Sequence, residues 1–304
     1  MLDDLLQRFR KRDRLALSRL VSLVARGEQA EAILAGVGPA AKPARVVAIT
    51  GSGGVGKSTL AGKLVEEVRA AGQTVAVLAC DPQSPLSGGA LLGDRFRMPA
   101  RPDDDGVFIR SLAAAGGHGA LAEHLDALVR LLEAFGFDVI LIETVGAGQG
   151  DTVVRDLADV LVLLLQPETG DDLQWEKAGL FEVADVIVIH KADMPGAERV
   201  EAQVVAALGL SSVPPVPVLR VSARTGAGLA ELWKTVAGLP LRRAARQEGR
   251  DLLRLAQEAL AARFAAAQAH DDPRLRDVLQ KWRAGELDAT KAAAAALDVL
   301  RNSE

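Results

Sequence analysis

The chain has 304 residues, which fits one α/β domain of ordinary size with helical additions. Its 36 basic and 40 acidic residues leave a formal net charge of −4, so charge gives no case for binding nucleic acid or an anionic membrane. Cys80 is the only cysteine, which excludes an intramolecular disulfide and a cysteine-rich metal site. Without a signal-peptide pattern or an apolar run of membrane length, we expect a soluble cytoplasmic protein.

The N-terminal region, residues 1–43, is predicted to be a helical extension. Residues 2–26 carry Leu, Val and Phe at helical spacing among charged residues, which predicts one amphipathic helix packed against an apolar surface. A second short helix is predicted over 28–34. The segment 36–43, rich in Gly, Pro and Ala, links this extension to the next domain.

Residues 44–240 are predicted to form the central domain, because short apolar strands alternate there with helical segments. This alternation predicts an α/β fold with a doubly wound, mostly parallel sheet, whose ligands bind at the carboxyl ends of the strands. The strands are predicted at 45–50, 74–80, 107–110, 138–143, 160–166, 185–190 and 216–221.

A glycine-rich loop follows the first predicted strand and precedes a predicted helix at 57–71. It has the G-x-x-x-x-G-K-S pattern of a phosphate-binding P-loop, in the strand–loop–helix context that gives the pattern its meaning. Its glycines let backbone N–H groups surround phosphate oxygens, Lys57 reaches the β- and γ-phosphates, and Ser58 offers a hydroxyl to Mg²⁺. We also expect Lys57 to be solvent-accessible in the empty site. The loop consists of Gly51, Ser52, Gly53, Gly54, Val55, Gly56, Lys57, Ser58 and Thr59.

Two carboxylates end predicted strands near this loop. Asp81 follows the second strand and could hold Mg²⁺ or cap the following turn. Glu143 ends the strand Asp138–Glu143 in the manner of a Walker-B acid, and Gly146 opens the loop 146–150, which we interpret as a switch. An acid that simply ends a strand is the alternative, which the P-loop upstream makes less attractive.

A candidate base-recognition motif follows the strand 185–189. His190-Lys191-Ala192-Asp193 resembles the N-K-x-D motif of GTPases, with His190 in the place of Asn. Asp193 can accept hydrogen bonds from guanine N1–H and the N2 amine, which adenine lacks, and Lys191 would lie along the base. His190 could offer a ring nitrogen to the base or to a loop carbonyl, or it could be a structural histidine. The companion loop, whose backbone N–H contacts guanine O6, consists of Ser222, Ala223 and Arg224.

The C-terminal region, residues 241–304, is predicted to be a helical arm. A long helix is expected over 241–268, a second helix starts at Asp272-Pro273, and Gly285 separates it from a third that ends near Leu300. Its apolar stripes without a catalytic grouping predict a dimerisation element.

Five motifs together resemble one family, the MeaB/ArgK-type GTPases of the SIMIBI class. They are G-S-G-G-V-G-K-S-T (51–59), D-P-Q-S-P-L-S-G-G-A-L-L-G-D-R-F-R-M (81–98), F-I-R-S (108–111), E-T-V-G-A-G-Q (143–149) and H-K-A-D (190–193). The resemblance implies a GTP/GDP-binding chaperone that hydrolyses GTP and gates cobalamin loading, protection and reactivation of an adenosylcobalamin-dependent acyl-CoA mutase such as methylmalonyl-CoA mutase.

The resemblance also implies roles for residues that the motifs alone do not define. Asp81, Asp94 and Glu143 would join Ser58 around Mg²⁺, and the catalytic residues would be Lys57, Glu143, Gln149 and Lys177. Gln149 would lie in the second switch, and Lys177 in a mobile segment that faces the partner. The chain departs from the family pattern at Cys80, Gly150-Asp151, Trp175 and His190.

Three other interpretations are compatible with a P-loop. A MinD/ParA-type ATPase has a signature lysine where this chain has Ser52, and it lacks a guanine-type K-x-D. A kinase of the ArgK description, which phosphorylates a small molecule or a periplasmic transport protein, would need an acceptor site, and no second constellation indicates one. A scaffold that binds nucleotide without hydrolysing it is the third.

Overall fold

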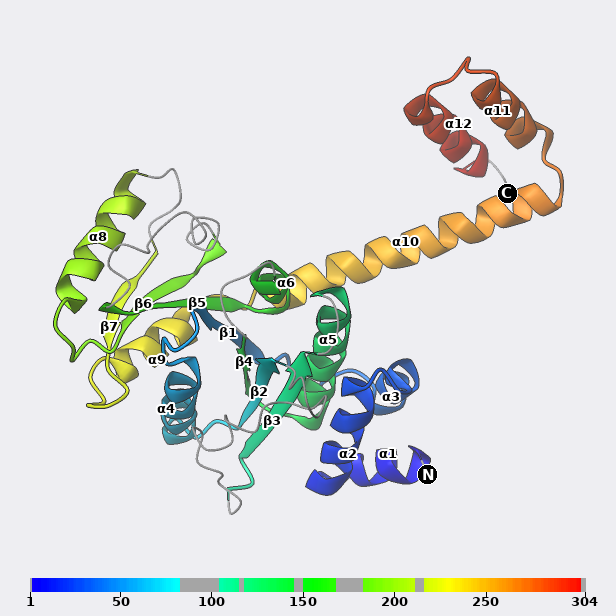
Figure 1. The fold of residues 1–304 in the computed structure, drawn as a ribbon. Helices are drawn as coiled ribbons and strands as arrows, with labels where there is room; N and C mark the ends of the chain where they lie inside the picture. The colour runs from blue at the N-terminus through cyan, green and yellow to red at the C-terminus, as the bar shows by residue number, and fades with distance from the viewer. Residues whose placement is uncertain are drawn as a thin grey trace. The chain divides into compact units, whose positions relative to one another are not determined.

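The computed structural model describes residues 2–82, 104–114, 118–144, 150–167, 183–210 and 216–301. Within these ranges the chain falls into two compact units, residues 1–243 and 244–304. Figure 1 shows the ribbon, with the sheet in the larger unit. None of the helices in the described ranges combines the length and apolar character that a membrane span requires.

The larger unit is built on a seven-stranded sheet in which every pair of neighbouring strands is parallel, in the order β3-β2-β4-β1-β5-β6-β7. β1, which carries the P-loop at its carboxyl end, is the central strand. All residues of β4, β5 and β6 are buried, as expected for a parallel sheet covered on both faces. The strands are β1 (Arg45–Gly51), β2 (Val75–Pro82), β3 (Val107–Ala114), β4 (Val139–Glu143), β5 (Val160–Leu165), β6 (Val186–His190) and β7 (Val218–Val221). All seven predicted strands are confirmed.

Helices cover both faces of this sheet (Figure 1). Alternate residues of each strand enter different apolar clusters: Val47 and Ile49 of β1 pack with the face of α4 and α9, whereas Val46 and Ala48 pack with α5 and the N-terminal helices. This alternation is what the pleat of a strand imposes. The covering helices are α4 (Lys57–Ala70), α5 (His118–Phe135), α6 (Gly150–Leu157), α8 (Ala197–Leu210) and α9 (Leu229–Gly238).

The N-terminal region forms two helices where one was predicted over 2–26: α1 (Leu2–Arg10) and α2 (Arg14–Ala25). The prediction was wrong because the spacing of apolar residues continues through the break. Arg12 has a left-handed φ of 64°, and the Asp13 side chain caps α2 by accepting from the backbone N–H of Leu15 and Ala16. The short helix predicted at 28–34 is α3 (Ala30–Val37).

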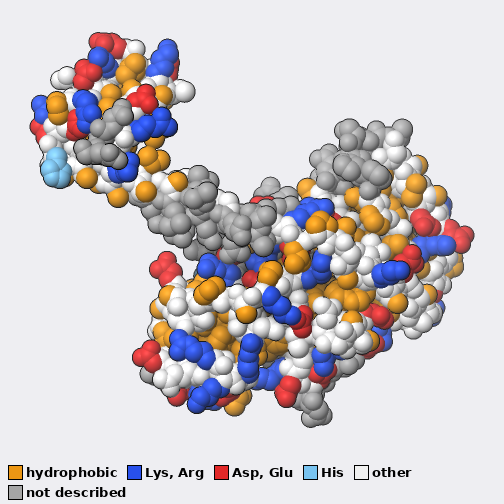
Figure 2. All heavy atoms as spheres, turned by 180° about the vertical axis from the view of Figure 1, so that it is seen from behind, with side chains coloured by type: hydrophobic (Ala, Val, Ile, Leu, Met, Phe, Trp, Pro, Cys, Tyr) orange, Lys and Arg blue, Asp and Glu red, His pale blue; other side chains and the backbone are white. Residues whose placement is uncertain are grey.

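The smaller unit consists of most of α10 (Arg243–Ala269) with α11 (Pro273–Arg283) and α12 (Ala289–Arg301). The three predicted helices of this region are confirmed. α11 begins as predicted, since the Asp272 side chain accepts from the backbone N–H of Arg274 and Pro273 occupies the first turn. Figure 2, a space-filling view, shows Lys/Arg and Asp/Glu side chains interspersed over the visible described surface, without a large region of one sign.

Candidate nucleotide site

The P-loop connects the end of β1 to the start of α4 through three glycines with positive φ: Gly51 (146°), Gly54 (74°) and Gly56 (101°). Glycine is required at two of them for lack of space as well. A Cβ on Gly51 would lie 2.6 Å from the Leu164 carbonyl oxygen, and one on Gly56 would lie 2.5 Å from the His190 ring. The loop therefore lies tightly between β5 and the end of β6.

Lys57 is buried, with a side chain that turns back onto its own loop. Its ammonium donates to the carbonyl oxygens of Gly51 (3.0 Å) and Ser52 (3.2 Å), and the residue is 7% exposed. The expectation of a solvent-accessible Lys57 is wrong, because carbonyl oxygens of its own loop satisfy donors of the ammonium there. Bringing phosphate oxygens to the loop would exchange these carbonyls for charged acceptors.

Ser58 and Glu143 meet at the carboxyl edge of the sheet. The parallel register pairs Ile49 of β1 with Glu143 of β4, so the acid lies beside the start of the P-loop. The Ser58 hydroxyl donates to Glu143 Oε1 over 2.6 Å, and both residues are buried. A hydroxyl and a carboxylate in contact are a donor set suited to a hard divalent cation such as Mg²⁺.

Four predicted site residues are described only in part or not at all. Asp81 belongs to β2, where its backbone lies two residues beyond the Ala79–Glu143 pair, and nothing is described of its side chain. Asp94, Gln149 and Lys177 lie outside the described residues. Within the described ranges, no group of three or more His, Cys, Asp or Glu side chains could hold a metal ion.

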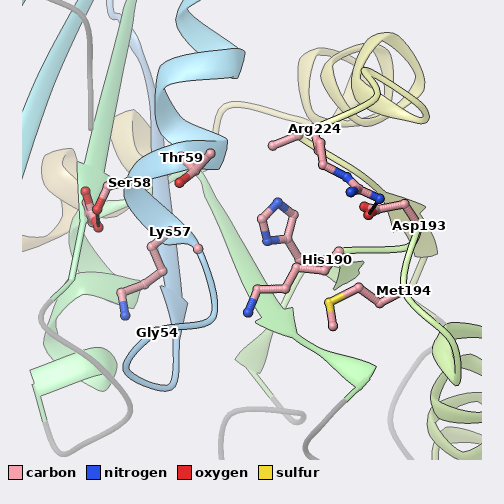
Figure 3. Close-up of a pocket in the computed structure, with 12 residues that line it drawn as sticks. Gly54, Lys57, Ser58, Thr59, His190, Asp193, Met194 and Arg224 are labelled. Carbon is pink, nitrogen blue, oxygen red and sulfur yellow. Dashed lines mark hydrogen bonds and ion pairs between the residues drawn. The ribbon is translucent and has the colours of Figure 1, made fainter. Parts of the chain in front are cut away.

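A cavity of about 650 Å³ connects the P-loop to the candidate base-recognition motif. Figure 3 shows Lys57 and Ser58 on one side of it and Asp193 and Arg224 on the other. The sequence-predicted residues from four separate segments thus line one cavity. The lining consists of Gly54, Gly56, Lys57, Ser58, Thr59, Glu143, His190, Lys191, Asp193, Met194, Ala223 and Arg224.

Asp193 is held by the loop that follows β7. It accepts a short hydrogen bond from the Ser222 hydroxyl, and its other oxygen lies 2.5 Å from the guanidinium of Arg224. The hydrogen bond from Ser222 and the charge of Arg224 lower the pKa of Asp193, so the carboxylate stays ionised near neutral pH. An ionised carboxylate presents only acceptors, which suits the two donors on the Watson–Crick edge of guanine.

Sequence patterns did not indicate that Met194 lines this cavity or that Lys191 contacts Gln166, and they left open whether His190 meets the base or a loop carbonyl. Met194 lines it directly after the motif, and nothing in the sequence distinguishes this methionine from a core residue. Lys191 has a left-handed φ of 55° and donates to the Gln166 side chain over 2.7 Å. His190 reaches across to the P-loop, where Nδ1 lies 2.7 Å from the Val55 carbonyl oxygen. Burial is the main cause that lowers the pKa of His190.

A P-loop at the end of the central strand of a parallel sheet, facing a K-x-D loop across one cavity, defines a P-loop nucleotide-binding protein. Residues 17–271 match the family described as "Methylmalonyl Co-A mutase-associated GTPase MeaB". The chain therefore belongs to the MeaB family of GTPases, as its motifs suggested.

Comparison with single proteins is consistent with membership of this family. A candidate GTPase of Pyrococcus horikoshii is 42% identical over 242 residues, which are 77% of this chain and 76% of that protein. A mouse protein described as "Methylmalonic aciduria type A homolog, mitochondrial" is 42% identical over 62% of this chain and 48% of its own length. Among solved structures, one described as a LAO/AO transport system kinase is 25% identical with a TM-score of 0.64 and covers 99% of this chain and 98% of its own.

Proposed function

We propose that this GTPase is a cytoplasmic chaperone of an adenosylcobalamin-dependent acyl-CoA mutase, whose cobalamin loading, protection and reactivation it gates. The observation that carries the proposal is a match inside a mutase. A protein of Nocardia farcinica described as "Fused isobutyryl-CoA mutase" is 40% identical to this chain over 191 residues, which are 60% of this chain and 18% of that protein. A GTPase segment in the same polypeptide as a mutase is expected to act on that mutase.

The cavity supports a division of roles among its residues. Lys57 neutralises the β- and γ-phosphates after leaving the carbonyls of Gly51 and Ser52, which lie 3.0 and 3.2 Å away. Asp193 recognises the N1–H and N2 amine of guanine, and the loop Ser222–Arg224 contacts O6. Gln149 and Lys177 are proposed for the second switch and the partner-facing segment on family grounds alone.

A magnesium ion is proposed beside the β- and γ-phosphates. The hydroxyl of Ser58 and the carboxylate of Glu143, in contact over 2.6 Å, supply suitable oxygen donors, and Asp81 and Asp94 complete the proposed set. When bound, Mg²⁺ would neutralise charge that develops on the phosphates during hydrolysis. The oxygen atoms of Ser58 and Glu143 are held in place because both residues are buried at the carboxyl edge of the sheet.

Self-association through the C-terminal unit is part of the proposal. Leu260, Trp282 and Leu297 are 39%, 51% and 48% exposed. Several large apolar side chains exposed on one small unit are typical of a surface that binds another protein. A two-fold homodimer in which each arm packs on its partner would cover them.

The function is tested by adding the chain and GTP to a cobalamin-dependent acyl-CoA mutase during prolonged turnover. We expect the mutase to keep its activity longer with the wild-type chain than with the Lys57→Ala variant, and GTP hydrolysis to rise when the mutase is present. Equal mutase lifetimes with the two proteins, for methylmalonyl-CoA and isobutyryl-CoA mutases alike, would overturn the chaperone assignment.

A kinase is the second candidate, favoured by the structural neighbour described as a LAO/AO transport system kinase. Its test is transfer of the labelled γ-phosphate of GTP to a periplasmic binding protein, with release of labelled phosphate to water measured in the same reaction. We expect the label only in free phosphate. MeaB membership leaves the MinD/ParA interpretation without support.

A further inference from the structure

His190 occupies a position between the two halves of the nucleotide cavity. The residue is 3% exposed, and its ring lines the cavity together with Asp193 and Ala223. Figure 3 shows the ring between Thr59, at the start of α4, and the pair formed by Asp193 and Arg224. Nδ1 contacts the Val55 carbonyl oxygen, while Nε2 is buried without a hydrogen-bond partner among the described residues. A buried ring nitrogen without a partner in a ligand cavity suggests that the ligand supplies one.

The contact with Val55 fixes which ring nitrogen carries the proton. A carbonyl oxygen can only accept, so at 2.7 Å Nδ1 must be the donor. The neutral ring therefore presents Nε2 as an acceptor, and only the protonated ring presents an N–H there. The ring is also held in place, since it packs so closely on Gly56 that a Cβ there would lie 2.5 Å from it.

Guanine offers no donor that a neutral His190 could use, if the proposed assignment of this cavity to GTP is correct. Its N1–H and the adjacent hydrogen of the N2 amine are assigned to Asp193, and O6 to a backbone N–H of the loop Ser222–Arg224, so the O6 side of the base offers no free donor. The atom next to O6 on the purine is N7, which is an acceptor in guanine and adenine alike. An Nε2 lone pair that faces N7 would be repelled, whereas an Nε2–H would form a hydrogen bond.

We infer that His190 recognises N7 of guanine as a protonated imidazolium, so that each guanine nucleotide bound takes up a proton at this side chain. The proton comes from solvent and is shared between Nε2 and N7 as a hydrogen bond. His190 is then a specificity-determining residue that replaces the amide of the usual N-K-x-D motif, and it makes guanine affinity depend on pH.

The surrounding charges are consistent with this coupling. Burial lowers the pKa of His190, and the charge of Lys191 acts in the same direction, while the Val55 carbonyl and the charge of Asp193 raise it. The other charged side chains that line the cavity are Lys57 on α4, Arg224 after β7 and Glu143 at the end of β4. The free site therefore favours a neutral ring, and the bound base supplies the acceptor that stabilises the charged one.

The test compares the full-length wild type with the His190→Asn variant, which restores an amide with donor hydrogens at every pH. The Kd for GDP is measured by calorimetry from pH 5.5 to 8 in two buffers of different ionisation enthalpy. Because titration of the GDP phosphates affects both proteins, the ratio of the two Kd values isolates residue 190. As pH falls, we expect the Kd of the wild type to decrease relative to that of the variant, by up to about tenfold per pH unit for one linked proton. The wild type should also take up more protons on binding than the variant does.

A second probe needs no variant. 7-Deaza-GDP lacks the N7 acceptor, so its wild-type affinity should lose the pH dependence that GDP shows beyond phosphate titration. A ratio of Kd values that stays constant with pH, or an equal pH dependence for GDP and 7-deaza-GDP, would overturn the inference and leave His190 as a tether of the P-loop. If neither protein binds GDP at any pH, the proposed nucleotide site fails first, and the inference with it.

Discussion

The two compact units of this chain bury their apolar side chains to different extents. In the larger unit, apolar residues from both faces of the sheet form continuous clusters, and most strand residues are fully buried. In the described part of the smaller unit, the buried residues are Leu275, Val278, Ala292 and Leu300. The core of the larger unit can hold a binding site rigid, whereas the smaller unit leaves Leu260, Trp282 and Leu297 partly exposed.

We expect the largest change in stability from truncating the chain near the boundary between the two units. Arg243, at the start of α10, is 3% exposed; its guanidinium pairs with Glu133 and its N–H donates to Asp159 over 2.7 Å. Truncation after Pro240 removes these contacts and the ion pair between Arg242 and Asp185, and it takes the arginine away from the buried Glu133 carboxylate, so we expect the larger unit to lose about 3–5 kcal/mol of unfolding free energy. Truncation after Gly249 keeps Arg243 and should cost far less. Denaturant unfolding of both proteins measures this, and equal midpoints would mean that Arg242 and Arg243 contribute nothing to stability.

Replacing Lys57 should abolish nucleotide binding while leaving the fold intact. We expect the Lys57→Ala variant to bind GTP about 100-fold more weakly or worse, because charge-assisted hydrogen bonds to phosphate contribute about 1.5–3 kcal/mol each. Calorimetry measures the affinity, and circular dichroism checks the fold. Lys63→Ala is the matched control, since Lys63 lies on the same helix but pairs with Glu66 outside the cavity. Wild-type affinity in the Lys57 variant would refute the phosphate-loop assignment.

Base selectivity should change when Asp193 becomes an amide. In the Asp193→Asn variant we expect GTP to bind about 10–100-fold more weakly, the loss of one or two hydrogen bonds to a charged acceptor. Xanthosine triphosphate should bind better than it does to the wild type, because its carbonyl replaces the N2 amine and meets an amide donor. Competition between GTP, ATP and xanthosine triphosphate gives the ranking; an unchanged order would show that Asp193 does not contact the base.

The sequence predicted those parts of the fold and site that depend on local pattern. Strand periodicity located all seven strands, and the P-loop glycines located the turn between β1 and α4. The break at Arg12 and the burial of Lys57 could not be predicted in this way, and the loop carbonyl that His190 contacts was one of several alternatives that the sequence left open. Each depends on a partner that the local pattern does not specify: a side-chain cap, carbonyls of the same loop, or a segment 135 residues away in sequence.

Acid should destabilise the larger unit through Asp138, at the amino end of β4. Burial has the largest single influence and raises the pKa of Asp138, but hydrogen bonds from Lys42 and from the N–H and hydroxyl of Thr74 together lower it to about 2. Because the folded-state pKa lies below the ordinary value, this stabilisation is present above about pH 4 and is lost as pH falls through 2. The Asp138→Asn variant should lose about 1–2 kcal/mol at pH 7 and little at pH 2. Urea unfolding at both pH values measures this, and an equal loss at the two would contradict it.

Replacing an exposed apolar residue in each unit should have the smallest effect on stability. It also compares the two units directly, because only the smaller one is proposed to mediate self-association. Trp282 of α11 is 51% exposed and Leu15 of α2 is 68% exposed, so Trp282→Ser and Leu15→Ser should each change unfolding free energy by under about 1 kcal/mol. If the smaller unit mediates the proposed homodimer, only the Trp282 variant should shift toward monomer in light scattering at micromolar concentration, with GTP affinity unchanged. A monomeric wild type would overturn the homodimer, and a shift caused by Leu15→Ser would move the interface to the N-terminal helices. Because Leu15 projects from a unit whose core is already complete, we expect its replacement to leave association as it is.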